Sequence, residues 1–249
     1  MEPNEYKTIF HVENQHWWYV GMARITITLL ANLYPGRTDL HILDAGCGTG
    51  GGMQYLAPFG RVIGCDFSML ALDLGRQRKL TRLVQASVTQ LPFASSQFDL
   101  VTSFDVLCHR AVGDYRVALA EFYRALRPGG RIFLRLPAYD WLRGRHDTIV
   151  HTEHRFTTHE VSKALINEGF VIERSSYVNS LLFPLALAKR TVEQILPDQG
   201  TNSDIQPNPP WQDKVLARFL NLEARWLQHH DLPFGLTVLA VGRKSTADH

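Results

Sequence analysis

The chain has 249 residues, of which 45% are apolar and 20% charged, so it is long and apolar enough to build a globular core. Its 26 basic and 24 acidic residues give a net charge of +2 without long blocks of one sign. A basic nucleic-acid-binding face is therefore not expected, and we expect a protein that acts on a small molecule.

The cysteines and the apolar segments of the chain indicate the cellular compartment in which we expect the protein. The three scattered cysteines, Cys47, Cys65 and Cys108, lack metal-ligand spacing and favour a reducing, cytoplasmic compartment. The N-terminal segment is polar and acidic where a signal peptide would be basic and then apolar. The most apolar stretch, 181–188, is far shorter than the roughly 20 residues of a membrane-spanning helix. We expect a cytoplasmic protein without a transmembrane segment.

From residue 39 onward, short apolar runs alternate with helical patterns, which is typical of parallel βαβ units. Strands are predicted at 40–45, 61–66, 82–87, 98–104, 131–137, 170–178 and 233–244. Helices are predicted at about 53–57, 68–79, 114–126, 158–168 and 211–228. The third of these helices should end at Pro128, Gly129 and Gly130. The pattern predicts an α/β, doubly wound, Rossmann-like sheet of seven strands, with ligands at the carboxyl ends of the strands.

The whole chain, 1–249, is expected to form one domain around this sheet. Its expected parts are an N-terminal lid helix at 1–38, the core sheet at 39–178, a helical insertion at 179–232 with a loop at 197–210, and the last strand and tail at 233–249. Two segments of the insertion, 180–196 and 211–228, carry apolar stripes with basic residues beside them. Such stripes mostly face a core, but they also suit a lipid-like substrate, a membrane surface or a dimer interface. Monomer and homodimer both stay open.

A glycine-rich loop, LDAGCGTGG at 43–51, follows the first strand and leads into a helix. Glycine lets a ligand approach the main chain, and the start of the helix offers unpaired amide groups. The loop can be written as GxGxG or as the GxGxxG of dinucleotide-binding proteins. Asp66, at the end of the second strand, can accept hydrogen bonds from ribose hydroxyls in both cases. The loop alone therefore predicts a nucleoside ligand without choosing between a methyl donor and a nicotinamide.

Three further segments follow this loop in order: GCDFS at 64–68, QASVTQLPFASSQFDLV at 85–101 and LRPGGRIFLRLP at 126–137. With the glycine loop, they resemble the class I S-adenosylmethionine-dependent methyltransferases over about residues 40–137. The resemblance implies a seven-stranded sheet whose last strand is antiparallel. It also implies in-line methyl transfer from S-adenosyl-L-methionine to a small-molecule acceptor, with S-adenosyl-L-homocysteine as product. An NAD(P)-dependent oxidoreductase and a non-catalytic S-adenosylmethionine-binding protein are the alternatives.

The resemblance assigns the cofactor contacts by position. Asp44 and the glycine-loop main chain would receive the methionine end, and Asp66 the ribose. Phe67 would pack on adenine, unless it is an ordinary core aromatic. Ser87 stands where the family often has an acid that contacts the adenine amino group, and its hydroxyl can still accept a hydrogen bond. The expected cofactor-binding residues are Asp44, Gly46, Cys47, Gly48, Asp66, Phe67, Ser87, Val88, Ser103, Phe104, Trp18 and Arg24.

Trp18 and Arg24 belong to the aromatic segment FHVENQHWWYVGMARI at 10–25. Similar segments in related methyltransferases form a helix that closes over the cofactor, and Arg24 is a candidate partner for the methionine carboxylate. The alternative is a helix fixed to the domain by its aromatic side chains.

Catalytic groups are expected after the fourth and fifth strands. His109 is a candidate general base, with a capping or interfacial histidine as the alternative. The other candidates, Tyr139, His151 and His154, occupy the segment AYDWLRGRHDTIVHTEHRFTTHE together with His146, Asp147 and Arg155. Their spacing fits no zinc motif, so no metal is predicted, and substrate binding, base catalysis and plain loop histidines stay open. The histidine arrangement resembles a bacterial subgroup of generic methyltransferases, which does not identify the acceptor. A lipid-like or glycan-related small molecule is expected.

Overall fold

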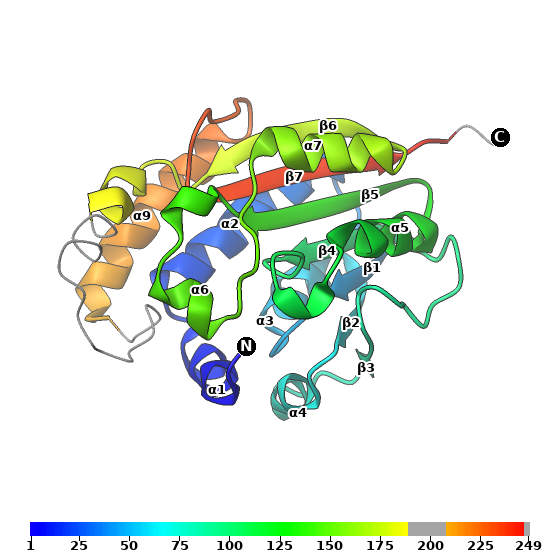
Figure 1. Cartoon of the computed structure of the whole chain (residues 1–249), viewed down its shortest axis with the longest axis horizontal. Coiled ribbons are helices and arrows are strands. Elements are labelled where there is room, and N and C mark those ends of the chain that lie inside the picture. Colours follow the sequence, from blue (N-terminus) through cyan, green and yellow to red (C-terminus); the bar gives the residue numbers. More distant parts are fainter. Residues whose placement is uncertain (189–207, 247–249) are drawn as a thin grey trace.

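A computed structural model describes residues 1–188 and 208–246 of the chain. Its centre is a seven-stranded sheet of order β3-β2-β1-β4-β5-β7-β6 (Figure 1). β7 is antiparallel to both of its neighbours, and the other neighbouring strands pair in parallel. The strands are β1 Leu40–Ala45, β2 Gly60–Asp66, β3 Leu83–Gln85, β4 Phe98–Phe104, β5 Leu126–Pro137, β6 Phe170–Val178 and β7 Thr237–Lys244. The predicted Rossmann-like fold with an antiparallel last strand is confirmed.

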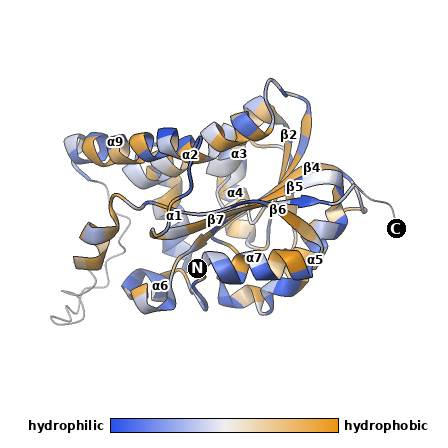
Figure 2. Cartoon of the chain, turned by 90° about the horizontal axis from the view of Figure 1, so that it is seen from above, coloured by the Kyte–Doolittle hydropathy of each residue, from blue (hydrophilic) through white to orange (hydrophobic). Residues whose placement is uncertain are grey.

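Helices cover both faces of the sheet, as the view along the sheet in Figure 2 shows. The side chains of α2, α3 and α9 pack on one face, and those of α5 and α7 on the other. The helices are α1 Pro3–Val12, α2 Trp17–Leu33, α3 Gly51–Leu56, α4 Met69–Gln77, α5 Tyr115–Ala125, α6 Arg145–Ile149, α7 Thr158–Asn167 and α9 Pro210–Trp226. Residues 183–188 are also helical.

The central strands are buried on both faces, which explains their continuous apolar runs. Leu134 of β5 belongs to the core under α5 and α7, whereas Phe133 belongs to the core under α2 and α9. Because side chains alternate along a strand, Arg135 faces the same side as Phe133. A cation is therefore placed beneath α2, at the carboxyl end of β5.

Two segments differ from the sequence prediction. β5 begins at Leu126 rather than Arg131, because Leu126 pairs with Phe98 before the register shifts at residues 127–130. The N-terminal segment forms two helices where one lid helix was expected. The His16 ring accepts a hydrogen bond from the Trp18 amide at 3.3 Å, so it caps a second helix after a break.

The helix α9 is apolar on two sides. Leu220, Ala224 and Leu227 are buried in the core shared with α2, as expected for a core-facing stripe. A second row is exposed to solvent and consists of Trp211, Val215, Phe219, Leu222 and Trp226. The predicted loop at 197–210 and the end of the predicted 180–196 helix lie almost wholly outside the described residues. Within the described chain, no helix combines the length and apolar character needed to cross a bilayer.

Candidate active site

A cavity of about 1520 Å³ opens at the carboxyl ends of β1, β2, β4 and β5 and reaches under α2 towards α6 and α9. Typical sites for one drug-sized ligand measure roughly 300–1,000 Å³. The cavity is therefore large enough for a nucleoside cofactor and a second small molecule together.

The glycine loop forms one wall of this cavity. The amides of Gly46 and Cys47 both donate to the Cys65 carbonyl, at 2.8 and 2.9 Å, which ties the loop to β2. Gly48 has a φ of +54° and donates its N–H to Asp66 Oδ2 at 2.9 Å. A Cβ on Gly48 would meet nothing within 4 Å, so its backbone lies open. The loop thus has the bare main chain that a nucleoside ligand requires.

The adenosine end of the expected site lies around Asp66. Besides the Gly48 amide, this carboxylate accepts the Ser68 N–H at 2.9 Å, and it still faces the cavity. Phe67 is 59% exposed and lines the same cavity, so the core-aromatic interpretation of Phe67 is wrong. Ser87 and Val88 line the cavity as well. A ribose acceptor and a free aromatic face are therefore adjacent.

Asp44 lies at the inner end of the loop. Its Oδ1 accepts a hydrogen bond from Thr102 Oγ1 at 2.8 Å, and burial raises the pKa of Asp44 to about 6. The carboxylate is thus ionised near neutral pH and can attract a cationic ligand group.

Of the two residues expected at the end of β4, Phe104 lines the cavity, whereas Ser103 is fully buried in the sheet and is not part of the lining.

The N-terminal helices are attached directly to the glycine loop. The Glu13 carboxylate accepts a hydrogen bond from the Thr49 hydroxyl. It also forms an ion pair with Arg78, whose Nη2 lies 2.7 Å from Glu13 Oε1. A Cβ on Gly51 would lie 2.2 Å from the Glu13 carboxylate. Gly51 therefore makes room for the N-terminal segment. Trp18 and Arg24 both line the cavity, and Arg24 is exposed.

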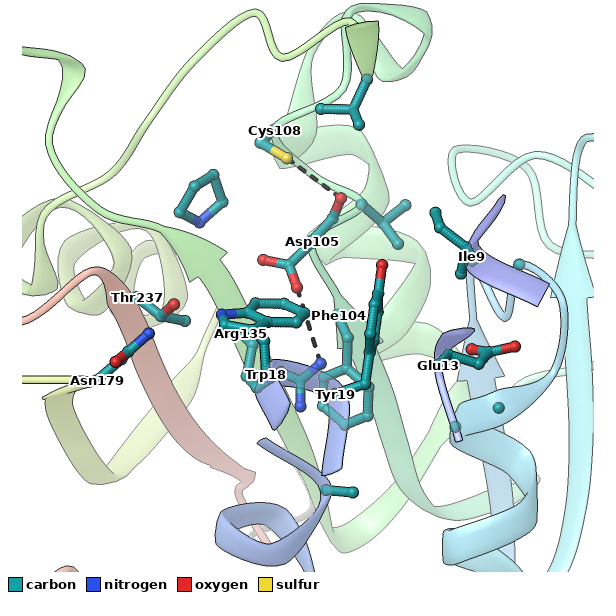
Figure 3. A pocket seen from close by; sticks show the side chains of 18 of the residues that line it. Ile9, Glu13, Trp18, Tyr19, Phe104, Asp105, Cys108, Arg135, Asn179 and Thr237 are labelled. Carbon is teal, nitrogen blue, oxygen red and sulfur yellow. Dashed lines mark hydrogen bonds and ion pairs between the residues drawn. The ribbon is translucent and has the colours of Figure 1, made fainter. Parts of the chain in front are cut away.

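Two charged residues that the sequence analysis missed meet in the middle of the cavity (Figure 3). Arg135 is 6% exposed, and its guanidinium lies 4.2 Å from the ring of Phe104 and 5.9 Å from that of Trp18. Its Nη2 is 3.7 Å from Asp105 Oδ2. Burial raises the pKa of Asp105, and Arg135 opposes that rise. The available signal was an arginine near the end of the otherwise apolar run IFLRLP.

His109 is the one expected catalytic residue in the cavity lining. Its Nδ1 accepts the Ala111 N–H at 3.0 Å, and its Nε2 lies 2.8 Å from the Met1 amino nitrogen. Burial lowers the pKa of His109 to about 4. His109 caps the short helical turn Arg110–Val112, which is the structural alternative considered for it.

Tyr139, His151 and His154 are not among the residues that line the cavity. Tyr139 stacks on Tyr177 with ring centroids 5.0 Å apart. His151 Nε2 contacts Glu2 Oε1 at 2.8 Å, and His154 Nε2 contacts Glu160 Oε1 at 2.7 Å. These contacts join the loop to the residue before α1 and to α7.

Asp147 and Arg155, from the same segment, line the cavity and pair with each other at 2.8 Å. Asp147 also accepts the Gly144 N–H at 2.7 Å, which fixes the start of α6. Across residues 1–188 and 208–246, no group of three or more His, Cys, Asp or Glu side chains could hold a metal ion.

Comparison with known proteins finds a family match over part of the chain. Residues 43–134 match the family model described as a methyltransferase domain. The malonyl-[acyl-carrier protein] O-methyltransferase of Enterobacter lignolyticus is 40% identical over 108 residues, which are 41% of this chain and 40% of that protein. The chain therefore matches about two fifths of this relative's length.

Two solved structures show the same fold over most of the chain. A Thermotoga maritima S-adenosylmethionine-dependent methyltransferase, described as a possible histamine N-methyltransferase, superposes with a TM-score of 0.59 at 17% identity and covers 97% of this chain and 95% of that one. Geranyl diphosphate C-methyltransferase from Streptomyces coelicolor, solved with S-adenosyl-L-homocysteine, has a TM-score of 0.59 at 16% identity and covers 87% of this chain and 73% of that one.

The open glycine loop, the acid at the end of β2 and the exposed aromatic beside it suit an adenosine-containing cofactor. The antiparallel β7 and the family match over the glycine loop through β5 point to the same conclusion. Residues 43–134 thus match a methyltransferase domain, within a fold shared with solved S-adenosylmethionine-dependent methyltransferases, and the geometry of the site suits S-adenosyl-L-methionine.

Proposed function

We propose that this chain transfers the methyl group of S-adenosyl-L-methionine to a small-molecule acceptor. When bound, the cofactor supplies an electrophilic methyl group, whose bond to sulfur breaks with the electron pair staying on sulfur, while the acceptor's lone pair forms the new bond. The observation that carries the proposal is one continuous cavity, with Asp44, Asp66 and Phe67 at one end and ample further volume beyond Asp105.

Cofactor binding is assigned to the residues of the glycine-loop end. Asp66 accepts the ribose hydroxyls, and the exposed ring of Phe67 packs on adenine. The ionised carboxylate of Asp44 attracts the methionine ammonium group. Arg24, exposed on α2 in the cavity lining, pairs with the methionine carboxylate.

Asp105 is the group that takes a proton from a neutral hydroxyl or amine acceptor. It follows β4 directly, lines the cavity, and its side chain is 33% exposed. Burial raises its pKa, which makes the carboxylate a better base. His109 is less suited, because both ring nitrogens already have partners within the protein: Nδ1 accepts the Ala111 amide, and Nε2 lies 2.8 Å from the Met1 amino nitrogen.

The acceptor is proposed to be a metabolite-sized molecule with an apolar part. The cavity lining also includes the apolar side chains of Val20, Leu182, Leu185 and Leu216. The names of the similar proteins mention a malonyl group on a carrier protein and geranyl diphosphate, which supports a small reacting group but different accepting atoms.

The test is a turnover assay that measures formation of S-adenosyl-L-homocysteine with a panel of O-, N-, S- and C-acceptors. We expect product with at least one acceptor class, and loss of product in Asp66→Ala. Tight cofactor binding without turnover on every acceptor would instead support a non-catalytic binding protein. Thermal stabilisation by NADH but not by S-adenosyl-L-methionine would support an oxidoreductase.

A further inference from the structure

A second group of polar side chains lines the cavity where β5 and β6 end and β7 begins. Thr237 pairs with Pro137 on one side and with Val178 on the other, so the three strand ends lie side by side. Arg135 precedes Pro137 by two residues on the same face of β5. Asn179 directly follows β6, and Figure 3 shows it beside Thr237, across from Arg135 and Trp18.

The polar atoms of this group are buried but incompletely paired. Asn179 has no exposed surface, and neither its side-chain oxygen nor its nitrogen has a hydrogen-bond partner within the described residues. The same is true of Arg135 Nε. Arg135 Nη1 donates to Thr26 Oγ1 at 3.3 Å, and Asp105 at 3.7 Å is beyond ordinary hydrogen-bond length. A buried donor without a partner costs about 1–3 kcal/mol, so these atoms are suited to a ligand.

The main chain around Asn179 is held firmly in place. Glu223 of α9 is 2% exposed and accepts hydrogen bonds from the amides of Asn179 and Ser180, the latter at 2.9 Å. Asn179 itself has a φ of +62°, which is uncommon for a residue other than glycine. The main chain that carries the Asn179 side chain is thereby held at the cavity wall before any ligand arrives, which lowers the entropic cost of binding.

The donors and charges of this group select the ligand chemistry. A guanidinium and an amide N–H₂ together present donors to a pair of anionic oxygens, the arrangement that carboxylates prefer. Asp105, which already faces Arg135, would repel a phosphate dianion more strongly than a carboxylate, because the dianion carries two negative charges and the carboxylate only one. The adjoining wall is apolar and includes Leu182 and Leu236.

We propose that Arg135 and Asn179 form a subsite that binds the carboxylate of a methyl acceptor with an apolar body. This inference rests on the proposed function, because it concerns the acceptor half of the same cavity. The carboxylate could also come from the methionine end of the cofactor, which the proposed function assigns to Arg24 instead. If the carboxylate belongs to the acceptor, Arg24 binds the cofactor and Arg135 does not. If it belongs to the cofactor, Arg135 contributes to cofactor binding.

The experiment compares octanoate with octanamide, which share the same apolar chain but differ in charge. Calorimetric binding is measured at pH 8 with S-adenosyl-L-homocysteine saturating, so that the methionine carboxylate is already bound. We expect octanoate to bind about tenfold more tightly than octanamide. Arg135→Gln and Asn179→Gly should each reduce that preference to less than threefold. Glycine suits the positive φ at 179, so this second variant keeps the backbone intact.

The affinity for S-adenosyl-L-homocysteine, measured without octanoate, distinguishes an acceptor carboxylate from the methionine carboxylate of the cofactor. This affinity should fall in Arg24→Gln and stay within threefold of the wild type in Arg135→Gln and Asn179→Gly. A tenfold loss in Arg135→Gln would assign the carboxylate to the cofactor and overturn the proposal. Equal binding of octanoate and octanamide by the wild type would overturn it too. Failure of the wild type to bind S-adenosyl-L-homocysteine would be a failure of the proposed function, and the octanoate comparison can then be repeated without it.

Discussion

Asp105 and Arg135 lie side by side at the ends of β4 and β5. The Asp105 amide donates to the Arg135 carbonyl at 2.8 Å, while Arg135 Nη2 lies 3.7 Å from Asp105 Oδ2. The main-chain bond holds Asp105 at a φ of +60° and turns its carboxylate towards the cavity. Arg135 favours the charged form of this half-buried acid and so opposes the rise in its pKa.

Asp105→Asn should lower the rate of methyl transfer by about 10² or more, the usual contribution of a general base. Asparagine tolerates positive φ, so the backbone should be preserved. Because burial raises the pKa of Asp105, the wild-type rate should fall as the pH drops through that raised value, and the variant should lack this dependence. Single-turnover rates against pH measure both effects. Wild-type turnover in Asp105→Asn would show that this proton transfer is not needed.

Asp44→Asn should stabilise the fold while weakening cofactor binding. The pKa of Asp44 is raised from 3.8 to about 6, so the stability that its neutral form provides is present below pH 4 and lost as the pH rises through about 6. Removing the buried charge at pH 8 should raise the free energy of unfolding by up to about 3 kcal/mol. Urea unfolding and calorimetric titration with S-adenosyl-L-methionine measure the two quantities. Unchanged cofactor affinity in Asp44→Asn would contradict the role given to this carboxylate.

Gly51→Ala should loosen the contact between the N-terminal segment and the glycine loop, because the new Cβ would overlap the Glu13 carboxylate and force this side chain to shift. We expect weaker binding of S-adenosyl-L-homocysteine and faster proteolysis between α1 and α2. The double variant with Glu13→Ala should bind no worse than Glu13→Ala alone, since the clash is then removed. Simple additivity of the two losses in binding free energy would show that Gly51 acts through something other than Glu13.

His109→Ala should keep at least half of the wild-type turnover and lose about 1 kcal/mol of stability, the typical value of a helix cap. His109→Asn should restore that stability, because asparagine is also a good capping residue. The lowered pKa, about 4, keeps the ring neutral in the native state. Its contribution to stability is therefore full above pH 6.5 and is lost as the pH falls towards 4. A hundredfold loss of turnover in both variants would identify His109 as a base after all.

The parts of the fold and site that could be predicted from sequence are those whose position depends on residues close to them in the sequence. Asp44 and Asp66 lie at the carboxyl ends of two neighbouring parallel strands, and the glycine loop lies between them in sequence. Their common location therefore follows from the parallel βαβ topology. The exposure of Phe67 settles a choice that local sequence left open, because either a core or a ligand can bury an aromatic ring.

The missed residues depend on contacts between distant segments. Arg135 and Asn179 come together only through the register of β5 and β6 on the two sides of β7. His151 and His154 were expected near the cofactor, but they contact Glu2, just before α1, and Glu160 of α7. Spacing within one loop does not reveal such contacts.

The most direct test of the account is a crystal structure of the chain with S-adenosyl-L-homocysteine bound. We predict the ribose hydroxyls on Asp66, adenine against Phe67, the ammonium group near Asp44, and the sulfur atom facing the space between Asp105 and Arg135. A ligand bound outside this cavity, or one with its ribose away from Asp66, would contradict the account.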